Sequence, residues 1–477
     1  MICYQPYRRL VPNFTPLKVG QNIGITPPRR KNLFEIFPGG PPGGFCPKGA
    51  KSGFIVFLFC VLIFFPGANL SIVHADATAP TPQNQEPQLT LLDCYRLALK
   101  QSERVAIKKS IIRQAEGQFV QSLSTVLPSV SFSYAQEYQD NRGNSSFRSP
   151  VPEAKFVFSQ PLFSGFKEFA AIAAGRAQRQ QRRYEMRRAE QLLFVDVTDA
   201  FYLFLTYQDD YKALETTRQA LEERFEELKK REQLGRSRPS EVANAQSRLS
   251  RIEADMELTE SQLETVRQLL EFLVGQPVTG VTDDDSVPMP FSPEEEFLEK
   301  VQQRPDVKAA QEAWNVAKKE VTVARAGFLP AANLEGNHYT KREGSSGDVD
   351  WDVTLAVEVP IFNGAENIGQ VKEANAKVDQ ARLESEEIER KGILEVRNTY
   401  TKWQTDLRRK ASLEKALKAS ERNYELQKED YSLSLVSNLT VLDALEELQN
   451  TRREFISVKN EAKRSYWKLK VAVGEAI

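Results

Sequence analysis

The 477-residue chain is poor in the residues that usually build catalytic and metal sites, with only two histidines and four cysteines. The cysteines are Cys3, Cys46, Cys60 and Cys94, and the first three precede the part of the chain expected to remain after export. A single remaining thiol makes no internal disulfide, and His338 without a second histidine nearby suggests no metal cluster. We expect Cys94 to be a small packed residue and His338 to be a structural or lumen-facing residue on or beside a strand.

The chain also lacks an excess of either charge and any glycine-rich phosphate loop. Its formal net charge is -1 although 27% of its residues are charged, so no basic surplus points to a nucleic acid partner. Asp283-Asp284-Asp285 lacks the spaced oxygen ligands of a calcium loop, and we expect a solvated loop there. No catalytic constellation and no cofactor site emerge. The sequence therefore predicts a protein that is not an enzyme and that has no nucleotide-driven energy source of its own.

The chain has no hydrophobic run long enough to span a membrane as a helix. Its longest apolar run, Phe54–Phe65, is too short for a hydrocarbon core of about 30 Å but fits the apolar part of a secretory signal. We assign residues 1–75 to a leader and residues 76–88, which are rich in Pro, Gln and Thr, to a linker. The alternative for the apolar run is an amphipathic or buried helix.

What the chain does have is a duplication over residues 89–476. Leu127-Pro128 recurs as Leu329-Pro330, 202 residues later, and the segment 160–165 recurs as 359–364, at an offset of 199. Each half reads as a helix, two short strands, one very long helix, a turn and another helix, and we place the repeats at 89–288 and 289–477. Chance similarity between two charged helical stretches is the alternative. Gln101 and Val105 also recur, as Gln303 and Val307, again 202 residues later. Three anchors in the same order favour a long, quasi-symmetric object over a globule with one cleft.

Hydrophobic spacing predicts the individual elements of each repeat. A first helix is expected at about 90–126, strands at about 128–140 and 152–163, and proline-free long helices at 166–234 and 365–433. At 1.5 Å per residue, each long helix would measure about 100 Å. Leu214, Leu221 and Leu228 follow a heptad, and the helix after residue 239 steps its apolar residues by three and four. This spacing favours coiled-coil-like packing over an ordinary amphipathic face.

The strands have one apolar and one polar face. Trp351, Val353 and Leu355 alternate with polar residues, as do Phe156 and Phe158, which is typical of strands that face lipid on one side and a lumen on the other. Four strands cannot close a barrel, and an open sheet edge cannot face lipid. Either the strands form a small sheet in water, or several chains pool them into one wall; three chains would supply twelve.

The ordered, duplicated segments resemble the TolC-like outer-membrane efflux protein family. The resemblance rests on Arg304-Pro305-Asp306-Val307, Gly327-Phe328-Leu329-Pro330, the segment Val359-Pro360-Ile361-Phe362-Asn363-Gly364 and the stretch 435–444. It implies a mainly α fold with a small β part, a homotrimer, a twelve-stranded barrel in outer-membrane lipid and an α-helical tunnel crossing the periplasm. It also implies docking to a periplasmic adaptor protein and an inner-membrane transporter.

The resemblance further implies that the two helix–helix turns form a periplasmic tip with acidic residues at its constriction. Asp443 matches the second aspartate of the family's tip stretch, Thr440 stands where the first would be, and Glu241 occupies that place in the first repeat. The turns themselves begin at Gly235 and Ser434. The simpler interpretation of Glu241 is that it offsets the helix dipole in a first turn. A ring of three carboxylates would favour cations and would link gating contacts.

These observations predict the outer-membrane channel of a tripartite efflux or type I secretion system. Such a channel is a passive exit duct for solutes that an inner-membrane transporter and an adaptor hand over. The alternative is a secreted or periplasmic coiled-coil scaffold or adaptor protein without a barrel. The sequence discloses neither the cargo nor the class of pump.

Overall fold

The computed structural model describes residues 89–137, 151–283, 293–343 and 347–475, all within the compact unit Pro82–Ile477. The expected leader and linker lie outside the described residues, as does the boundary between residues 288 and 289. The first repeat contains α1 (Leu91–Gln101), α2 (Glu103–Ser124), β1 (Ser129–Glu137), β2 (Val151–Ser164), α3 (Lys167–Gln233) and α4 (Pro239–Val274). The second contains α5 (Glu294–Glu299), the 3-10 turn η1 (Lys300–Gln303), α6 (Pro305–Arg325), the 3-10 turn η2 (Ala326–Phe328), β3 (Ala331–Arg342), β4 (Trp351–Glu358), α7 (Glu366–Ser432) and α8 (Asn438–Ala472).

The single first helix expected at 90–126 is wrong, because the chain breaks at Ser102. This residue has extended backbone angles, and its side chain caps α2 by accepting a hydrogen bond from the N–H of Val105. The break has a counterpart in the second repeat, where η1 ends before Pro305 opens α6. Both repeats therefore begin with a short helix, a sharp break and a longer helix that leads to the hairpin.

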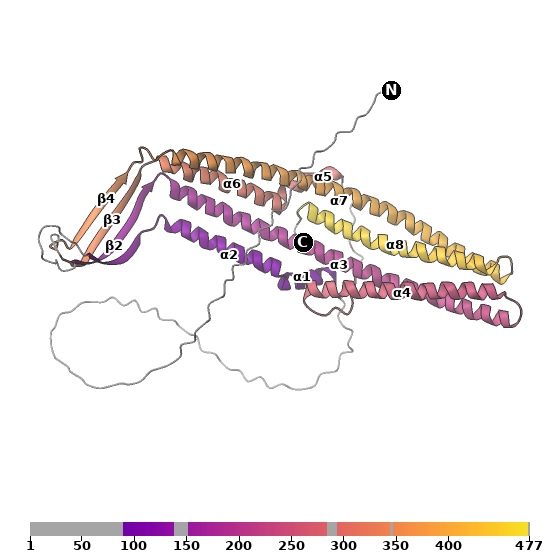
Figure 1. Ribbon diagram of the computed structural model, residues 1–477. Helices are drawn as coiled ribbons and strands as arrows, with labels where there is room; N and C mark the ends of the chain where they lie inside the picture. The colour runs from indigo at the N-terminus through magenta and orange to yellow at the C-terminus, as the bar shows by residue number, and fades with distance from the viewer. Residues whose placement is uncertain (1–88, 138–150, 284–292, 344–346, 476–477) are drawn as a thin grey trace, which may run out of the picture. The chain divides into compact units, whose positions relative to one another are not determined.

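The two long helices have the predicted extent, with 67 residues each. Each follows its strand through two successive residues with positive φ, Gly165 and Phe166 in one repeat and Gly364 and Ala365 in the other. In Figure 1 the sheet lies at one end of these helices, and the α3–α4 and α7–α8 turns lie at the other. The unit therefore has a β end and a helical end, about 100 Å apart along α3 or α7.

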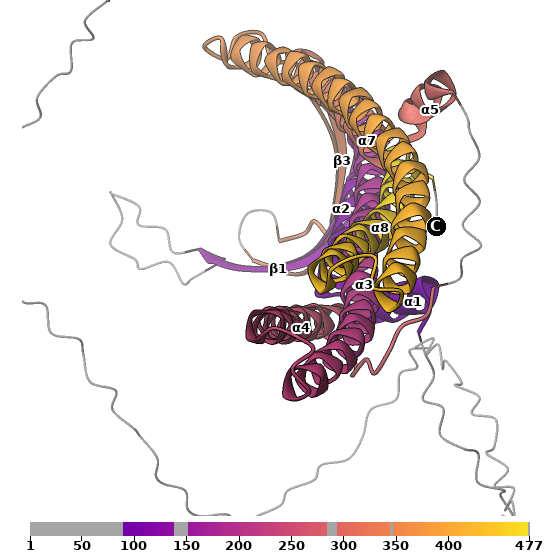
Figure 2. The ribbon, with the colours of Figure 1, turned by 90° about the vertical axis from the view of Figure 1, so that its right-hand side faces the viewer.

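The four strands form one antiparallel sheet in the order β1-β2-β3-β4. The two hairpins share one register: Ser129 lies opposite Ser159, and the residues 202 and 199 positions later, Ala331 and Glu358, also lie opposite each other. The duplication thus holds residue by residue in the backbone pairing. Viewed end-on in Figure 2, the sheet is curved, and β1 and β3 follow an arc.

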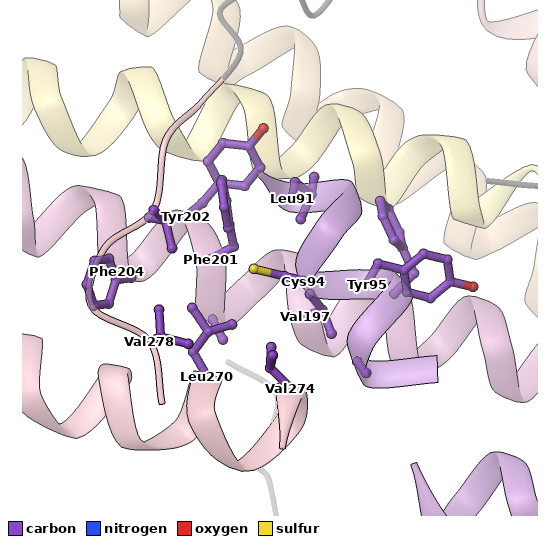
Figure 3. Packing of buried hydrophobic residues seen from close by; sticks show 14 of the residues in the cluster. Leu91, Cys94, Tyr95, Val197, Phe201, Tyr202, Phe204, Leu270, Val274 and Val278 are labelled. Atoms are coloured by element: carbon purple, nitrogen blue, oxygen red, sulfur yellow. The ribbon is translucent and has the colours of Figure 1, made fainter. Parts of the chain in front are cut away.

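The principal hydrophobic cluster lies midway along the helices, where α1, α3, α4 and α8 meet. Phe194, Phe201 and Cys94 are fully buried in it. Figure 3 shows Cys94 and Phe201 among their apolar neighbours. Burial raises the pKa of the Cys94 thiol to about 12, so the thiol stays protonated at neutral pH. Cys94 is thus a packed residue, as predicted.

Toward the helical end, a smaller cluster contains the heptad leucines of α3. Leu221 and Leu228 are buried against Ala245 of α4 and Leu442 of α8. The 3-4 spacing of α4 therefore faces neighbouring helices, and Thr259, which interrupts its apolar residues, is buried and donates its hydroxyl to the carbonyl of Asp255. The helical end is held together by side chains from both repeats.

Candidate functional site: the helical tip and the sheet

The two helix–helix turns at the helical end have the same backbone geometry. Gly235 has a φ of 69° and Ser434 has a φ of 61°. In each turn the next residue donates its N–H to a carbonyl five residues earlier: Arg236 to Arg231, and Leu435 to Asp430. Left-handed backbone costs a serine about 1–2 kcal/mol more than it costs a glycine. The second turn thus carries local strain that the first avoids.

The helices that leave these turns are capped differently. In the second repeat, Ser437 caps α8 and accepts the N–H of Thr440. In the first repeat, Pro239 opens α4, and the hydroxyl of Ser237 donates to the carboxylate of Glu241 at 2.6 Å. Glu241 lies in the first turn of α4, where a negative charge is favourable. Glu241 therefore has a hydrogen-bond partner and a helix-stabilising position within its own chain.

Asp443 joins the two repeats through Arg248 of α4. The Arg248 guanidinium donates to the Asp443 carboxylate at 2.6 Å, to Glu446 at 2.5 Å and to the carbonyl of Leu442 at 3.1 Å. Asp443 and Glu446 remain largely exposed, whereas the Arg248 side chain is half-buried. One arginine thus ties the α3–α4 hairpin to the α7–α8 hairpin. Nothing in the sequence singles out Arg248, because it lies within an ordinary charged helix.

Two arginines of α3, Arg224 and Arg231, hold the α7–α8 turn in place. The Arg224 guanidinium stacks over the ring of Tyr431, 3.7 Å from its centroid, and donates to Asn438 at 2.6 Å. Arg231 donates to the Tyr431 hydroxyl at 3.1 Å. Stacking and hydrogen bonding from a planar guanidinium are worth more than an exposed point charge. Side chains from both α3 and α4 therefore hold the α7–α8 hairpin in place at the helical end.

Midway along the helices lies a buried ionic cluster that fixes the C-terminal end of α8. Arg304 donates to Asp306 and Glu395 at 2.7 Å each and to the carbonyl of Ala472, and Arg188 approaches both carboxylates within 3.4 Å. Burial alone would raise the pKa of Asp306, but the Arg304 hydrogen bond and the Arg188 charge hold it below its ordinary value. The segment Arg304-Pro305-Asp306-Val307, one of those on which the family resemblance rests, thus has a structural role, since it holds the C-terminal end of α8.

One further acidic residue departs from expectation. The Asp283 carboxylate is paired with the ammonium group of Lys463, which is itself buried. The prediction of a merely solvated loop is wrong at this residue, because a buried lysine needs a counter-charge. Residues 284 and 285 lie outside the described residues.

The sheet separates its two faces as the alternation predicts. One face is apolar and exposed along β1, β2 and β4; its members include Val130, Phe132, Tyr134, Phe156, Phe158, Trp351, Val353, Leu355 and Val357. On the other face, Asp352 accepts hydrogen bonds from Asn337 at 3.0 Å and from Tyr339 at 2.7 Å, and Lys155 pairs with Glu153. Trp351 is 67% exposed, so within the described chain this face has no cover.

The register places His338 on the apolar face of the sheet, so of the two expectations for it, a structural or a lumen-facing residue, only the lumen-facing one disagrees with the structure. His338 lies opposite Phe156 on one side and Trp351 on the other, and Phe132 completes the row. Its neighbours Asn337 and Tyr339 point to the polar face. A histidine is amphipathic and suits the border between an apolar band and water.

Within the described ranges, no group of three acidic, histidine or cysteine side chains is placed to hold a metal ion. Among the described helices, none is both long enough and apolar enough to cross a bilayer. The described residues form an amphipathic curved sheet joined to a helical stem, an architecture that fits a membrane-anchored duct protein.

Comparison with known proteins agrees with this class. The family model for Outer membrane efflux protein matches residues 94–276 and 299–475. The chain is 23% identical to the outer membrane protein TolC of Vibrio cholerae over 74% of this chain and 83% of TolC. It is 22% identical to the alkaline protease secretion protein AprF of Pseudomonas aeruginosa over 86% and 87%. The crystal structure of VceC from Vibrio cholerae superimposes with a TM-score of 0.71 at 19% identity, over 81% of this chain and 96% of VceC.

The chain belongs to the outer membrane efflux protein family. It is an outer-membrane protein that forms an exit duct, with its helices in the periplasm. The family is one of channels and not of enzymes. The alternative function, that of a secreted or periplasmic coiled-coil scaffold or adaptor protein, is therefore wrong.

Proposed function

We propose that three copies of the chain assemble into a closed twelve-stranded barrel, four strands from each, continued by an α-helical tunnel. One observation carries this proposal: the curved four-stranded sheet has a polar face, an exposed apolar face and two edge strands. A sheet edge in lipid leaves backbone groups without hydrogen bonds, and only closure removes both edges. In the homotrimer the apolar face contacts outer-membrane lipid and the polar face lines the lumen.

The helical end is the entrance to this duct and the docking site for a periplasmic adaptor fed by an inner-membrane transporter. The names of relatives in protease secretion and in efflux support such a partnership. Asp443, Glu241, Thr440, Ser434 and Gly235 lie at the turns that would surround the entrance. Three copies of Asp443 would give a ring of carboxylates, which favours cations. The Arg248–Asp443 ion pair would hold neighbouring hairpins together in the narrow state.

Single-channel recording in planar bilayers tests both parts of this proposal. Asp443→Asn removes the carboxylate ring and should lower cation preference. Arg248→Ala breaks the same ion pair but keeps the carboxylate, so it should raise conductance while cation preference persists. Unchanged conductance and selectivity in both variants would reject the role of the tip as an entrance. A wild-type protein that migrates as a monomer without heating and carries no current would reject the trimeric channel itself.

A further inference from the structure

One face of α3 changes from apolar to basic along the helix. Phe201 and Phe194 are buried in the principal cluster, where they pack with residues of α1. The same face continues toward the sheet as Arg187, Arg183 and Arg176, because spacings of seven and four residues return to one side of a helix. All three arginines are exposed, and in this part of the molecule α3 runs beside α2 (Figure 1). Positions that are apolar and covered in one part of the helix are thus basic and uncovered two turns away.

α2 adds two basic residues on the same side. The Arg183 guanidinium lies 3.6 Å from the carboxylate of Glu116, which shows which side of α2 adjoins this face of α3. Lys109 and Arg113 precede Glu116 by seven and three residues, so they share its side of α2, and both are exposed.

We call Lys109, Arg113, Arg176, Arg183 and Arg187 the basic face. Within the described parts of the chain, the contact between Arg183 and Glu116 is the only ion pair that these five residues make. Arg113 otherwise donates to the hydroxyl of Ser110 at 3.0 Å, and the Arg187 guanidinium lies 5.8 Å from the centre of the Tyr184 ring of its own helix. Most of the positive charge on this face is therefore available to a partner.

The fold itself does not require these charges, as the second repeat shows. Offsets of 202 residues in α2 and 199 residues in α3 convert the basic face into the positions Gln311, Asn315, Asn375, Arg382 and Glu386. Five positive charges in the first repeat thus correspond to one positive and one negative charge in the second, a net charge of zero. Helices of the same shape form without the basic residues, so the residues serve something other than the fold.

The basic face lies on the outer side of the proposed duct. α1 and the segment around Val278 form a second layer over Phe194 and Phe201, on the same side of α3 as the arginines. A second layer inside a ring of helices would block the passage, whereas the outside has room for it. Because the helices lie in the periplasm, the basic face meets the contents of the periplasm.

The membrane is too far away to be the partner of this face. α3 begins at Lys167 beside the sheet, and Arg176 and Arg187 follow nine and twenty residues later. At 1.5 Å per residue they lie about 14 Å and about 30 Å from the start of the helix. Attraction to lipid headgroups fades within a Debye length, which is about 8 Å at physiological ionic strength. A polyanion of the periplasm therefore fits the basic face better than a lipid surface does.

We propose that the basic face binds the cell wall, the cross-linked, peptide-bearing glycan through which a duct across the periplasm has to pass. The peptides of this polymer carry free carboxylates, and a guanidinium binds a carboxylate through two parallel hydrogen bonds. The three arginines of α3 extend over about 17 Å, which suits a polymer with repeated carboxylates and not one small anion. The inference goes beyond the proposed channel function and uses it only to identify the outer side of α3.

Co-sedimentation with purified, insoluble cell-wall sacculi tests this inference on the detergent-solubilised protein. The triple variant Arg176→Gln, Arg183→Gln and Arg187→Gln should bind at least about fivefold more weakly than wild type in about 0.1 M salt, because three exposed ion pairs are lost. In about 0.5 M salt the wild-type protein should be released, since the Debye length falls to about 4 Å. Amidation of the carboxylates of the sacculi should weaken binding of the wild type to the same degree.

Two further triple variants separate the site from net charge and from misfolding. Arg236→Gln, Arg397→Gln and Arg422→Gln remove three exposed arginines that lie outside the basic face, and this variant should bind like wild type. Replacing the three arginines of α3 by lysine keeps the charge but not the forked geometry, so this variant should bind with intermediate affinity. Equal weakening in the two glutamine variants would overturn the site, because net charge alone would then govern binding.

The remaining outcomes are equally direct. Undiminished binding by the glutamine variant of α3, or equal binding to native and amidated sacculi, would overturn the inference. In planar bilayers the same variant should keep the conductance and ion preference of wild type, and a change in either would place the arginines in the lumen and overturn the inference. A wild-type protein that binds sacculi through this face but carries no current would refute the channel proposal and leave the wall contact standing.

Discussion

Removal of the Arg304 guanidinium should destabilise the chain more than removal of most of its charges. The Arg304 side chain is only 2% exposed, and it bonds to Asp306, Glu395 and the carbonyl of Ala472. Arg304→Ala would leave two carboxylates side by side and a carbonyl without its donor. Breaking a buried ion pair costs about 3–5 kcal/mol. We expect about 3 kcal/mol, because Glu395 is partly exposed and Arg188 continues to neutralise both carboxylates.

Urea unfolding of the detergent-solubilised protein, followed by tryptophan fluorescence, measures this loss. Trp403 is a buried residue of α7, the helix that also carries Glu395 of the cluster, so its emission should report the transition. Arg304→Lys keeps the charge but not the forked geometry, and its midpoint should lie between those of wild type and Arg304→Ala. The matched surface control is Arg96→Ala, whose ion pair with Asp93 is exposed and worth at most about 1 kcal/mol. Equal midpoints for Arg304→Ala and Arg96→Ala would refute the reasoning.

Two further predictions concern the membrane face and acid stability. Val353→Lys places a charge on the apolar face and should lower the free energy of unfolding by about 2–4 kcal/mol near the middle of the bilayer, whereas Thr354→Lys on the polar face should lower it far less. Unfolding of the two variants in lipid vesicles measures this difference. Equal losses of stability would contradict the assignment of faces. The pKa of Asp306 is lower in the folded than in the unfolded chain, so its stabilisation is complete above about pH 4 and is lost as the pH falls through the folded pKa. Asp306→Asn should therefore flatten the fall of the urea midpoint below about pH 4, and an unchanged acid profile would exclude this carboxylate as its source.

The long helices and the strand faces could be predicted because their signals are local. Proline-free stretches bounded by Gly165 and Gly235 gave the extent of α3 within a residue or two. The heptad Leu214, Leu221 and Leu228 is buried because leucines at helical spacing share one face. Alternation along β4 is unbroken, so its apolar face follows directly from the side-chain period of two.

The remaining features depend on partners that are remote in the sequence. Ser102 breaks the first helix, but a serine within an amphipathic pattern is a weak signal until its capping bond is seen. The burial of Arg304 could not be predicted, because two of its partners, Glu395 and the carbonyl of Ala472, lie about ninety and one hundred and seventy residues away in the sequence. The face on which His338 lies could not be assigned from the sequence, because alternation in β3 is weak around Gly336 and only the pairing with Phe156 fixes the face.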